Sequence, residues 1–245
     1  MPRLAGELVQ VPVDVLFTMG TRAERIVAEA VETTPLVVYS CDPFEHVTPL
    51  AHPAGNLTGV TCMTTELSPK RLELLKEVVP KASRVMFLQD PEAASNAVKL
   101  TQEAAPRLGV RLQVANVGVP EELQPELTMI ANERPDALFV FPDVVLSSYP
   151  RPQELADFAL KAHLPTMRAF RFRRCGRAHV LRRAQSEIYT SAAEQVAKIL
   201  DGARPAELPL RQATRFELVI NLKTAKALGL MIPQSLLLRA DEVTQ

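Results

Sequence analysis

The sequence has no long apolar run and no excess of charge of either sign, and both absences exclude classes of protein. No apolar stretch approaches the roughly 20 residues that a membrane-spanning helix needs. Lysine plus arginine number 28, and aspartate plus glutamate also number 28, so the net charge gives no reason to expect a nucleic-acid partner. The 245 residues are 47% hydrophobic and 23% charged, as expected for one large or two small globular domains.

Cysteine and histidine are scarce and poorly spaced for a metal site. Cys41, Cys62 and Cys175 form an odd number without a Cys-x-x-Cys motif, which argues against both a disulfide framework and a metal. We therefore expect buried single thiols. His46 and His52 are six residues apart, whereas a helical zinc pair is four apart, and we expect neither metal nor cofactor.

The short motifs of the common enzyme classes are also missing. The sequence contains no Gly-x-Ser-x-Gly, Gly-x-x-x-x-Gly-Lys or Gly-x-Gly-x-x-Gly, so hydrolase, nucleotide-binding and dinucleotide-binding functions lack their usual signatures. The start, MPRLAGELVQVPVDVLF, lacks the order of basic, apolar and small residues of an export signal. A chain that begins in this way is expected in the cytoplasm.

The sequence does contain a dense alternation of strand-like and helix-like segments. Amphipathic spacing predicts helices such as residues 22–32, and Ser68 with Pro69 is expected to open another as N-cap and first helical residue. This alternation predicts a doubly wound α/β architecture with parallel sheets. The β-rich runs are residues 13–17, 36–40, 57–61, 84–88, 111–115 and 137–141.

Three of these strands end in polar loops, at residues 18–21, 41–43 and 142–143. The carboxyl edge of a parallel sheet is where helix N-termini converge, so these loops are candidate ligand contacts. Gly20 and Thr21 offer N–H groups and a hydroxyl to a carboxylate or carbonyl, and Asp42 can accept hydrogen bonds from an amine. The alternative is that Asp42 and Asp143 only cap the segments that follow them.

A family resemblance extends over most of the chain. The stretch GNLTGVT, the following ELSPKRLELLKEVVPKASRV and the final FELVINLKTAKALGLMIPQSLLLRADEVTQ resemble the substrate-binding proteins of bacterial ABC transporters. The resemblance implies an α/β fold of the type I periplasmic-binding-protein class, with two doubly wound parallel-sheet lobes that clamp a small ligand and signal to a membrane permease. The first lobe is expected over residues 1–61 plus 185–213, and the second over 62–184 plus 214–245.

The resemblance also implies a function and a site. The function is capture of a small solute, an amino acid or a small organic anion, for an ABC importer, without covalent chemistry and in the periplasm or on a lipid anchor. The open alternatives are a cytoplasmic ligand sensor of the same fold, a racemase-like enzyme that uses Cys41 and Cys62, and a non-functional fragment. The expected ligand-binding residues are Thr18, Gly20, Thr21, Asp42, Pro43 and Asp143.

Two departures from the family pattern stand out. Relatives have a signal, a strand, a helix and a second strand before the segment that resembles ELVQVPVDVLF, so we expect the first lobe to be incomplete, with exposed edges and apolar faces that favour partnering. Residues 168–183 are rich in arginine where the family usually has a glycine-rich run that ends in Ser-Tyr-Gly. One interpretation is an anion or nucleic-acid patch with Phe170 and Phe172.

We favour another hypothesis for the arginine-rich stretch. The genetic code permits residues 170–183 to be read one base later as FDFVDAAGLMSYGA, which restores the Ser-Tyr-Gly ending. A pair of compensating frameshifts would explain both the arginines and the missing motif. The nucleotide sequence tests this hypothesis directly.

Overall fold

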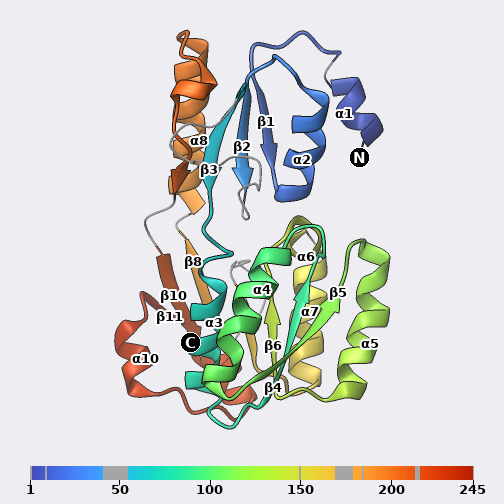
Figure 1. Cartoon of the computed structure of the whole chain (residues 1–245). Helices are drawn as coiled ribbons and strands as arrows, with labels where there is room; N and C mark the ends of the chain where they lie inside the picture. The colour runs from blue at the N-terminus through green and yellow to red at the C-terminus, as the bar shows by residue number, and fades with distance from the viewer. Residues whose placement is uncertain are drawn as a thin grey trace. The chain divides into compact units, whose positions relative to one another are not determined.

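The chain forms two compact units, each made from two separate stretches (Figure 1). The structure is a computed structural model that describes residues 2–8, 10–40, 55–148, 150–168, 179–183, 185–212 and 216–244. Unit 1 comprises Met1–Met63 and Ala184–Arg215, and unit 2 comprises Thr64–Arg183 and Phe216–Gln245. The lobe boundaries expected from the sequence lie within two residues of these limits.

Unit 1 is built on a parallel sheet with the strand order β1-β2-β3-β9. Helix α2 packs on one face of this sheet and α8 on the other, while α1 packs against α2. A single 3₁₀ turn, η3, precedes β9. The elements are α1 (Pro2–Leu8), β1 (Leu16–Met19), α2 (Thr21–Ala30), β2 (Leu36–Ser40), β3 (Leu57–Thr61), α8 (Gln185–Leu200), η3 (Pro205–Glu207) and β9 (Arg211–Gln212).

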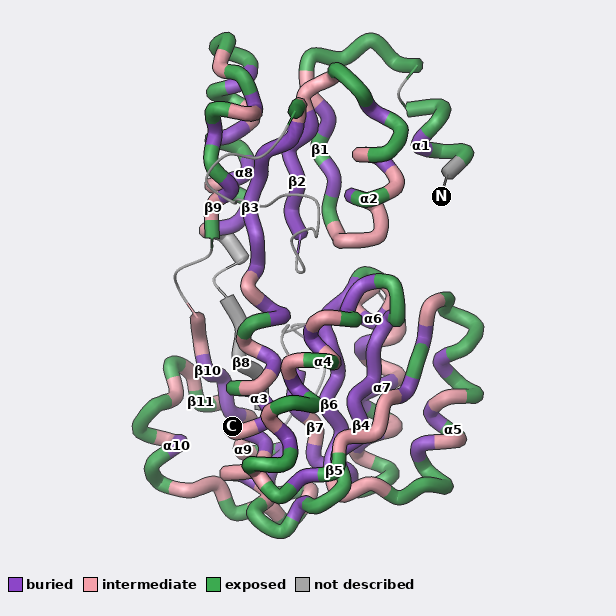
Figure 2. The backbone as a smooth tube through the Cα atoms, in the orientation of Figure 1, coloured by how far each residue is buried: buried purple, intermediate pink, exposed green. Residues whose placement is uncertain are grey.

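The apolar sequence of β2 reflects helices on both faces of the sheet. Leu36 and Val38 pack with Val27 of α2, whereas Val37 and Tyr39 pack with the apolar side of α8. A strand that is buried on both faces has no polar side, so its sequence reads as a continuous apolar run instead of an alternation. Figure 2 shows this burial along β2 and the neighbouring β3.

Unit 2 is built on a larger mixed sheet with the strand order β11-β10-β8-β7-β6-β4-β5. Its strands are parallel except that β8 and β10 pair antiparallel. The strands are β4 (Arg84–Gln89), β5 (Arg111–Asn116), β6 (Ala137–Val140), β7 (Thr166–Arg168), β8 (His179–Arg183), β10 (Phe216–Asn221) and β11 (Glu242–Thr244).

The helices of unit 2 enclose two apolar clusters, one on each face of the sheet. Phe87 and Phe139 belong to the cluster beneath α3 and α4, and Leu88 and Val140 to the cluster beneath α5 and α7. The helices are α3 (Ser68–Val78), α4 (Ser95–Ala104), α5 (Leu123–Glu133), α6 (Val144–Ser147), α7 (Arg151–Lys161), α9 (Leu222–Ala227) and α10 (Gln234–Arg239), with 3₁₀ turns η1 (Ala105–Leu108) and η2 (Pro120–Glu122).

The predicted α/β architecture with parallel sheets is confirmed, and two local predictions need correction. The strand expected at residues 13–17 is β1, which begins only at Leu16. Ser68 is the first residue of α3 instead of its N-cap, and its hydroxyl donates to the Thr64 carbonyl at 2.8 Å. The arginine-rich stretch ends in β8, which is part of the unit 2 sheet; residues 169–178 lie outside the described part of the chain.

Candidate functional site

The first candidate contact of unit 1 is the tight connection between β1 and α2. Gly20 is the only residue between them, and its φ of 97° and ψ of 137° lie in a region that favours glycine. Its N–H donates to the Tyr39 carbonyl of β2 at 2.9 Å. No side chain of the described residues caps α2, so the N–H groups of its first turn are available at the carboxyl edge of the sheet.

Hydroxyl groups surround this connection. Thr21 Oγ1 lies 3.3 Å from Ser40 Oγ, at the end of the neighbouring strand β2. Thr18 is only 7% exposed, and its hydroxyl has no hydrogen-bond partner among the described residues. The structure therefore brings together the predicted residues Thr18, Gly20 and Thr21 in unit 1 and adds Ser40 to them.

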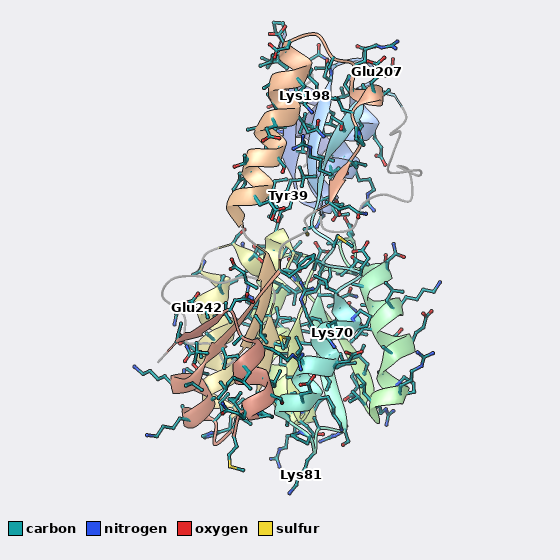
Figure 3. All side chains as sticks on the ribbon, turned by 90° about the vertical axis from the view of Figure 1, so that its left-hand side faces the viewer. Tyr39, Lys70, Lys81, Lys198, Glu207 and Glu242 are labelled. Atoms are coloured by element: carbon teal, nitrogen blue, oxygen red, sulfur yellow. The ribbon has the colours of Figure 1, made fainter. Side chains whose placement is uncertain are left out.

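An aromatic pair lies at the same ends of the strands. The rings of Tyr39 and Tyr189 are 6.3 Å apart and inclined by 72°, an edge-to-face arrangement. Figure 3 labels Tyr39. The Tyr189 hydroxyl donates to Met19 Sδ at 3.8 Å. This pair could not be predicted from the sequence, because Tyr189 reaches β2 only through the return of the chain into unit 1. Tyr39 could have been predicted as a site residue from the sequence, because it lies one residue before the carboxyl end of its strand.

In unit 2, three buried charged residues gather at the carboxyl ends of adjacent strands. Asp90 follows β4, Asp143 follows β6, and Arg168 ends β7. The Asp90 N–H donates to Asp143 Oδ2 at 3.3 Å, and the Arg168 guanidinium donates to the Leu146 carbonyl at 2.7 Å. Asp90 had a signal in the sequence, because Asp90-Pro91 repeats the pattern of Asp42-Pro43. Arg168 could not be recognised as a site residue from the sequence, because several further arginines follow it.

Asp143 acts as the N-cap of α6. Its Oδ1 accepts a hydrogen bond from the Leu146 N–H at 2.6 Å, as the capping alternative predicted. The pKa of the Asp143 carboxyl is raised to about 7, mainly by burial and also by the nearby charge of Asp90, while the two backbone N–H donors and Arg168 oppose the shift. A role for Asp143 in ligand binding stays a prediction, as it does for Asp42 and Pro43, which lie outside the described residues.

The expectation of single free thiols is wrong for Cys62. Cys62 is fully buried and disulfide-bonded, and the other two cysteines lie outside the described residues. A sulfur held in a disulfide carries no transferable proton, so the racemase-like alternative loses one of its two acid–base groups. His46 and His52 also lie outside the described residues, within which no three histidine, cysteine, aspartate or glutamate side chains form a metal-binding group.

Two doubly wound α/β units, each completed by a second stretch of chain, define the periplasmic-binding-protein class of substrate-binding proteins. The family model of the ABC transporter substrate binding protein matches residues 3–244, and the chain belongs to this family. A comparison with curated proteins gives no match. No helix in the described part of the chain is both long and apolar enough to span a membrane.

Solved structures with the same fold cover nearly the whole chain. A conserved domain protein from Vibrio cholerae is 26% identical with a TM-score of 0.91, over 99% of this chain and 82% of that one. A Streptococcus pneumonia ABC domain in complex with L-Trp is 23% identical with a TM-score of 0.89, over 99% and 84% of the two chains. A ligand-free, open substrate-binding protein with adhesive properties from Clostridium difficile is 19% identical with a TM-score of 0.62, over 100% and 82%.

Family and fold together establish the coarse function. The chain is a small-molecule-binding protein of the ABC substrate-binding family. Substrate-binding proteins of this fold are not enzymes, which agrees with the missing catalytic motifs.

Proposed function

We propose that this chain captures a small solute that carries a carboxylate, an amino acid or a small organic anion, for an ABC importer. The supporting observation is the carboxyl edge of unit 1, where the first turn of α2 lacks a side-chain cap and lies beside the Thr21 and Ser40 hydroxyls. Backbone N–H groups at a helix N-terminus attract an anion, and a hydroxyl adds a directed hydrogen bond. These donors can bind a carboxylate even when no basic side chain of the protein contacts it.

The aromatic pair favours a solute with an apolar portion. Tyr39 and Tyr189 present ring surfaces at the same strand ends, together with the half-exposed Met19. Aromatic rings stack favourably on other rings. Because the Streptococcus pneumonia structure contains L-Trp, aromatic amino acids are the first compounds to test.

The test is calorimetric titration of the purified chain with the common amino acids and with small organic acids. We expect binding of at least one carboxylate, and a Thr21→Val chain should bind it roughly 10- to 100-fold more weakly, because a hydrogen bond to a charged group contributes roughly 1.5–3 kcal/mol. Thr128→Val is the matched control, since the exposed Thr128 hydroxyl lies in unit 2 and donates to the Gln124 carbonyl of its own helix. Equal affinities of the two variants would contradict the assignment of Thr21.

We also propose that the protein works outside the cytoplasm. The disulfide of Cys62 supports this location, because disulfides persist in oxidising compartments and are rare in the cytosol. The test is to label free thiols in cells that express the protein, before and after reduction, and to fractionate those cells. A reduced Cys62 in the cytosolic fraction would instead favour the ligand-sensor alternative.

The importer role requires its own experiment. Deletion of the gene should reduce uptake of the solute found by calorimetry, and restoration of the gene should recover it. Unchanged uptake together with tight binding in vitro would separate solute binding from transport.

A further inference from the structure

A buried glutamine with an unused carbonyl lies at the carboxyl edge of unit 2. Gln89 is the last residue of β4 and is only 6% exposed. Its Nε2 donates to Oδ1 of Asn116, its register partner at the end of β5, at 3.0 Å. Its Oε1 is buried and has no hydrogen-bond partner among the described residues. Asn116 therefore fixes the Gln89 amide and leaves the carbonyl oxygen unpaired.

An unpaired buried oxygen is unfavourable, but it is not by itself a sign of a ligand. Folding removes the water that bonded to the oxygen, so native proteins pair nearly all such groups. Gln195 of unit 1 is 1% exposed, donates to the Pro209 carbonyl at 3.0 Å, and also has an unpaired Oε1 within the described part of the chain. The two glutamines differ in position, since Gln195 lies within α8 and Gln89 at the end of a strand.

Gln89 lies at the point where the unit 2 sheet reverses its strand order. β5 pairs with one side of β4, and β6 pairs with the other. Helix α4, which follows β4, and helix α5, which follows β5, consequently cover opposite faces of the sheet. Open α/β sheets bind their ligands outside the carboxyl ends of the strands at such a reversal. The unpaired carbonyl of Gln89 is thus at the position where a ligand is expected.

We propose that Gln89 is a specificity-determining residue, whose Oε1 accepts a hydrogen bond from a protonated amine of the bound solute. The inference rests on the proposed function and adds a requirement for a donor group to the carboxylate. Asn116 is a positioning residue, because it orients the Gln89 amide and makes its own contact through the backbone. The Asn116 N–H donates to Glu126 Oε1 at 2.9 Å, which anchors the end of β5.

The charges at this edge favour a protonated amine as the donor. Among the described residues, two acids, Asp90 and Asp143, gather here with one base, Arg168. Both carboxylates accept hydrogen bonds, Asp143 from the Asp90 N–H and Asp90 from the Glu92 N–H at 2.9 Å. An ammonium group has three donors and no acceptor, so it suits an edge of acceptors with an excess of acid.

The first experiment compares an amino acid with the same acid without its amine. The probes are L-Trp and indole-3-propionate, or the corresponding pair for another amino acid that binds, titrated into the full chain by calorimetry. Gln89→Met replaces the carbonyl by an apolar group, and should weaken the amino acid roughly 10-fold or more without changing the affinity for its amine-free analogue. Gln195→Met is the matched control and should change neither affinity.

Stability separates this role from a structural one. Gln89→Met no longer buries an unpaired oxygen, so its urea midpoint should equal or exceed that of the wild type. A lower midpoint with an unchanged preference for the amino acid would show that Gln89 is only structural. Wild-type binding of an amine-free acid as tightly as its amino acid would overturn the inference and leave the proposed function intact. Binding of no carboxylate at all would overturn both.

A second variant tests the role of Asn116. Asn116→Ala removes the acceptor that orients the Gln89 amide, so it should weaken the amino acid in the same direction as Gln89→Met, but less. The double variant should bind no more weakly than Gln89→Met alone, because Asn116 acts through Gln89. Additive losses would overturn the assignment of Asn116 as a positioning residue.

Discussion

Asp143 shows how burial of a single carboxyl changes the pH dependence of stability. Its folded pKa of about 7 exceeds the ordinary value of 3.8, so between these pH values the folded chain holds a proton that the unfolded chain has lost. Stability therefore falls as pH rises from about 4 to 7, by roughly 4 kcal/mol in all.

Asp143→Asn should remove this pH dependence. Asparagine retains an oxygen that can accept the Leu146 N–H, but it cannot ionise. We expect urea denaturation to show a free energy of unfolding for the variant that exceeds that of the wild type at pH 8 and does not exceed it at pH 4. A wild-type advantage that is equal at both pH values would reject the buried-carboxyl explanation.

Asp136, also in unit 2, changes the pH dependence of stability in the opposite direction. Hydrogen bonds from the Ser83 and Arg84 N–H groups, at 2.7 and 2.8 Å, lower the pKa of its carboxyl, with the Ser83 N–H as the largest cause. Its stabilising contribution is present above the unfolded pKa of 3.8 and is lost as pH falls through the lower folded value. Asp136→Asn should therefore destabilise the chain at pH 7 and have little effect near pH 2, as measured by denaturation at both pH values.

At the scale of elements, the close approach of β2 and β3 depends on one glycine. A Cβ at Gly59 would lie 2.0 Å from the Val38 carbonyl oxygen and 2.6 Å from the Val38 nitrogen, which no side-chain rotation can relieve. We expect Gly59→Ala to lower the free energy of unfolding by about 3 kcal/mol or more, in the range of severe packing and backbone mutations. Chemical denaturation measures this loss.

Gly6→Ala is the matched control for this prediction. Gly6 lies within α1 and has no atom within 4 Å of an added Cβ. Because alanine is a better helix former than glycine, this variant should be neutral or more stable by up to about 1 kcal/mol. A comparable loss in both variants would show that the packing of β2 against β3 is not the cause.

Strands buried on both faces could be predicted from the sequence, and small elements could not. β2 and β3 have the predicted bounds because turn residues flank their apolar runs. β9 and β11 contain two and three residues, so they have no periodicity of their own and form only by pairing with a longer strand. Strand β8 could not be predicted for another reason, since an arginine-rich sequence is not typical of a strand.

The residues of the candidate site also fall into those that the sequence predicts and those that it does not. Gly20 and Thr21 could be identified because a strand, a glycine turn and a helix are adjacent in sequence. Tyr189 and Arg168 could not, because each depends on a strand order that brings distant stretches together. Local patterns thus predict the helix N-terminus, while the side chains around it depend on tertiary structure.

At the scale of the whole molecule, the disulfide predicts the number of reactive thiols. With Cys62 oxidised, two of the three cysteines are consumed, so the denatured, unreduced chain should react with one equivalent of a thiol reagent and with three after reduction. Reduction should also lower the free energy of unfolding by about 2–4 kcal/mol, the usual contribution of a disulfide.

A variant checks the thiol count independently. Cys62→Ala contains two cysteines, and both should react without prior reduction. If the unreduced wild-type chain instead yields three equivalents, Cys62 is a free thiol in the purified protein.

The two-stretch construction of each unit has a consequence for synthesis on the ribosome. The α8-facing side chains of the unit 1 sheet, Val37, Tyr39 and Val60, are made early, but α8 follows only after all of residues 64–183. At 5–20 residues per second, this apolar face waits on the order of ten seconds for its cover. The nascent chain therefore offers a binding site to chaperones during an interval that is set by the order of its own sequence.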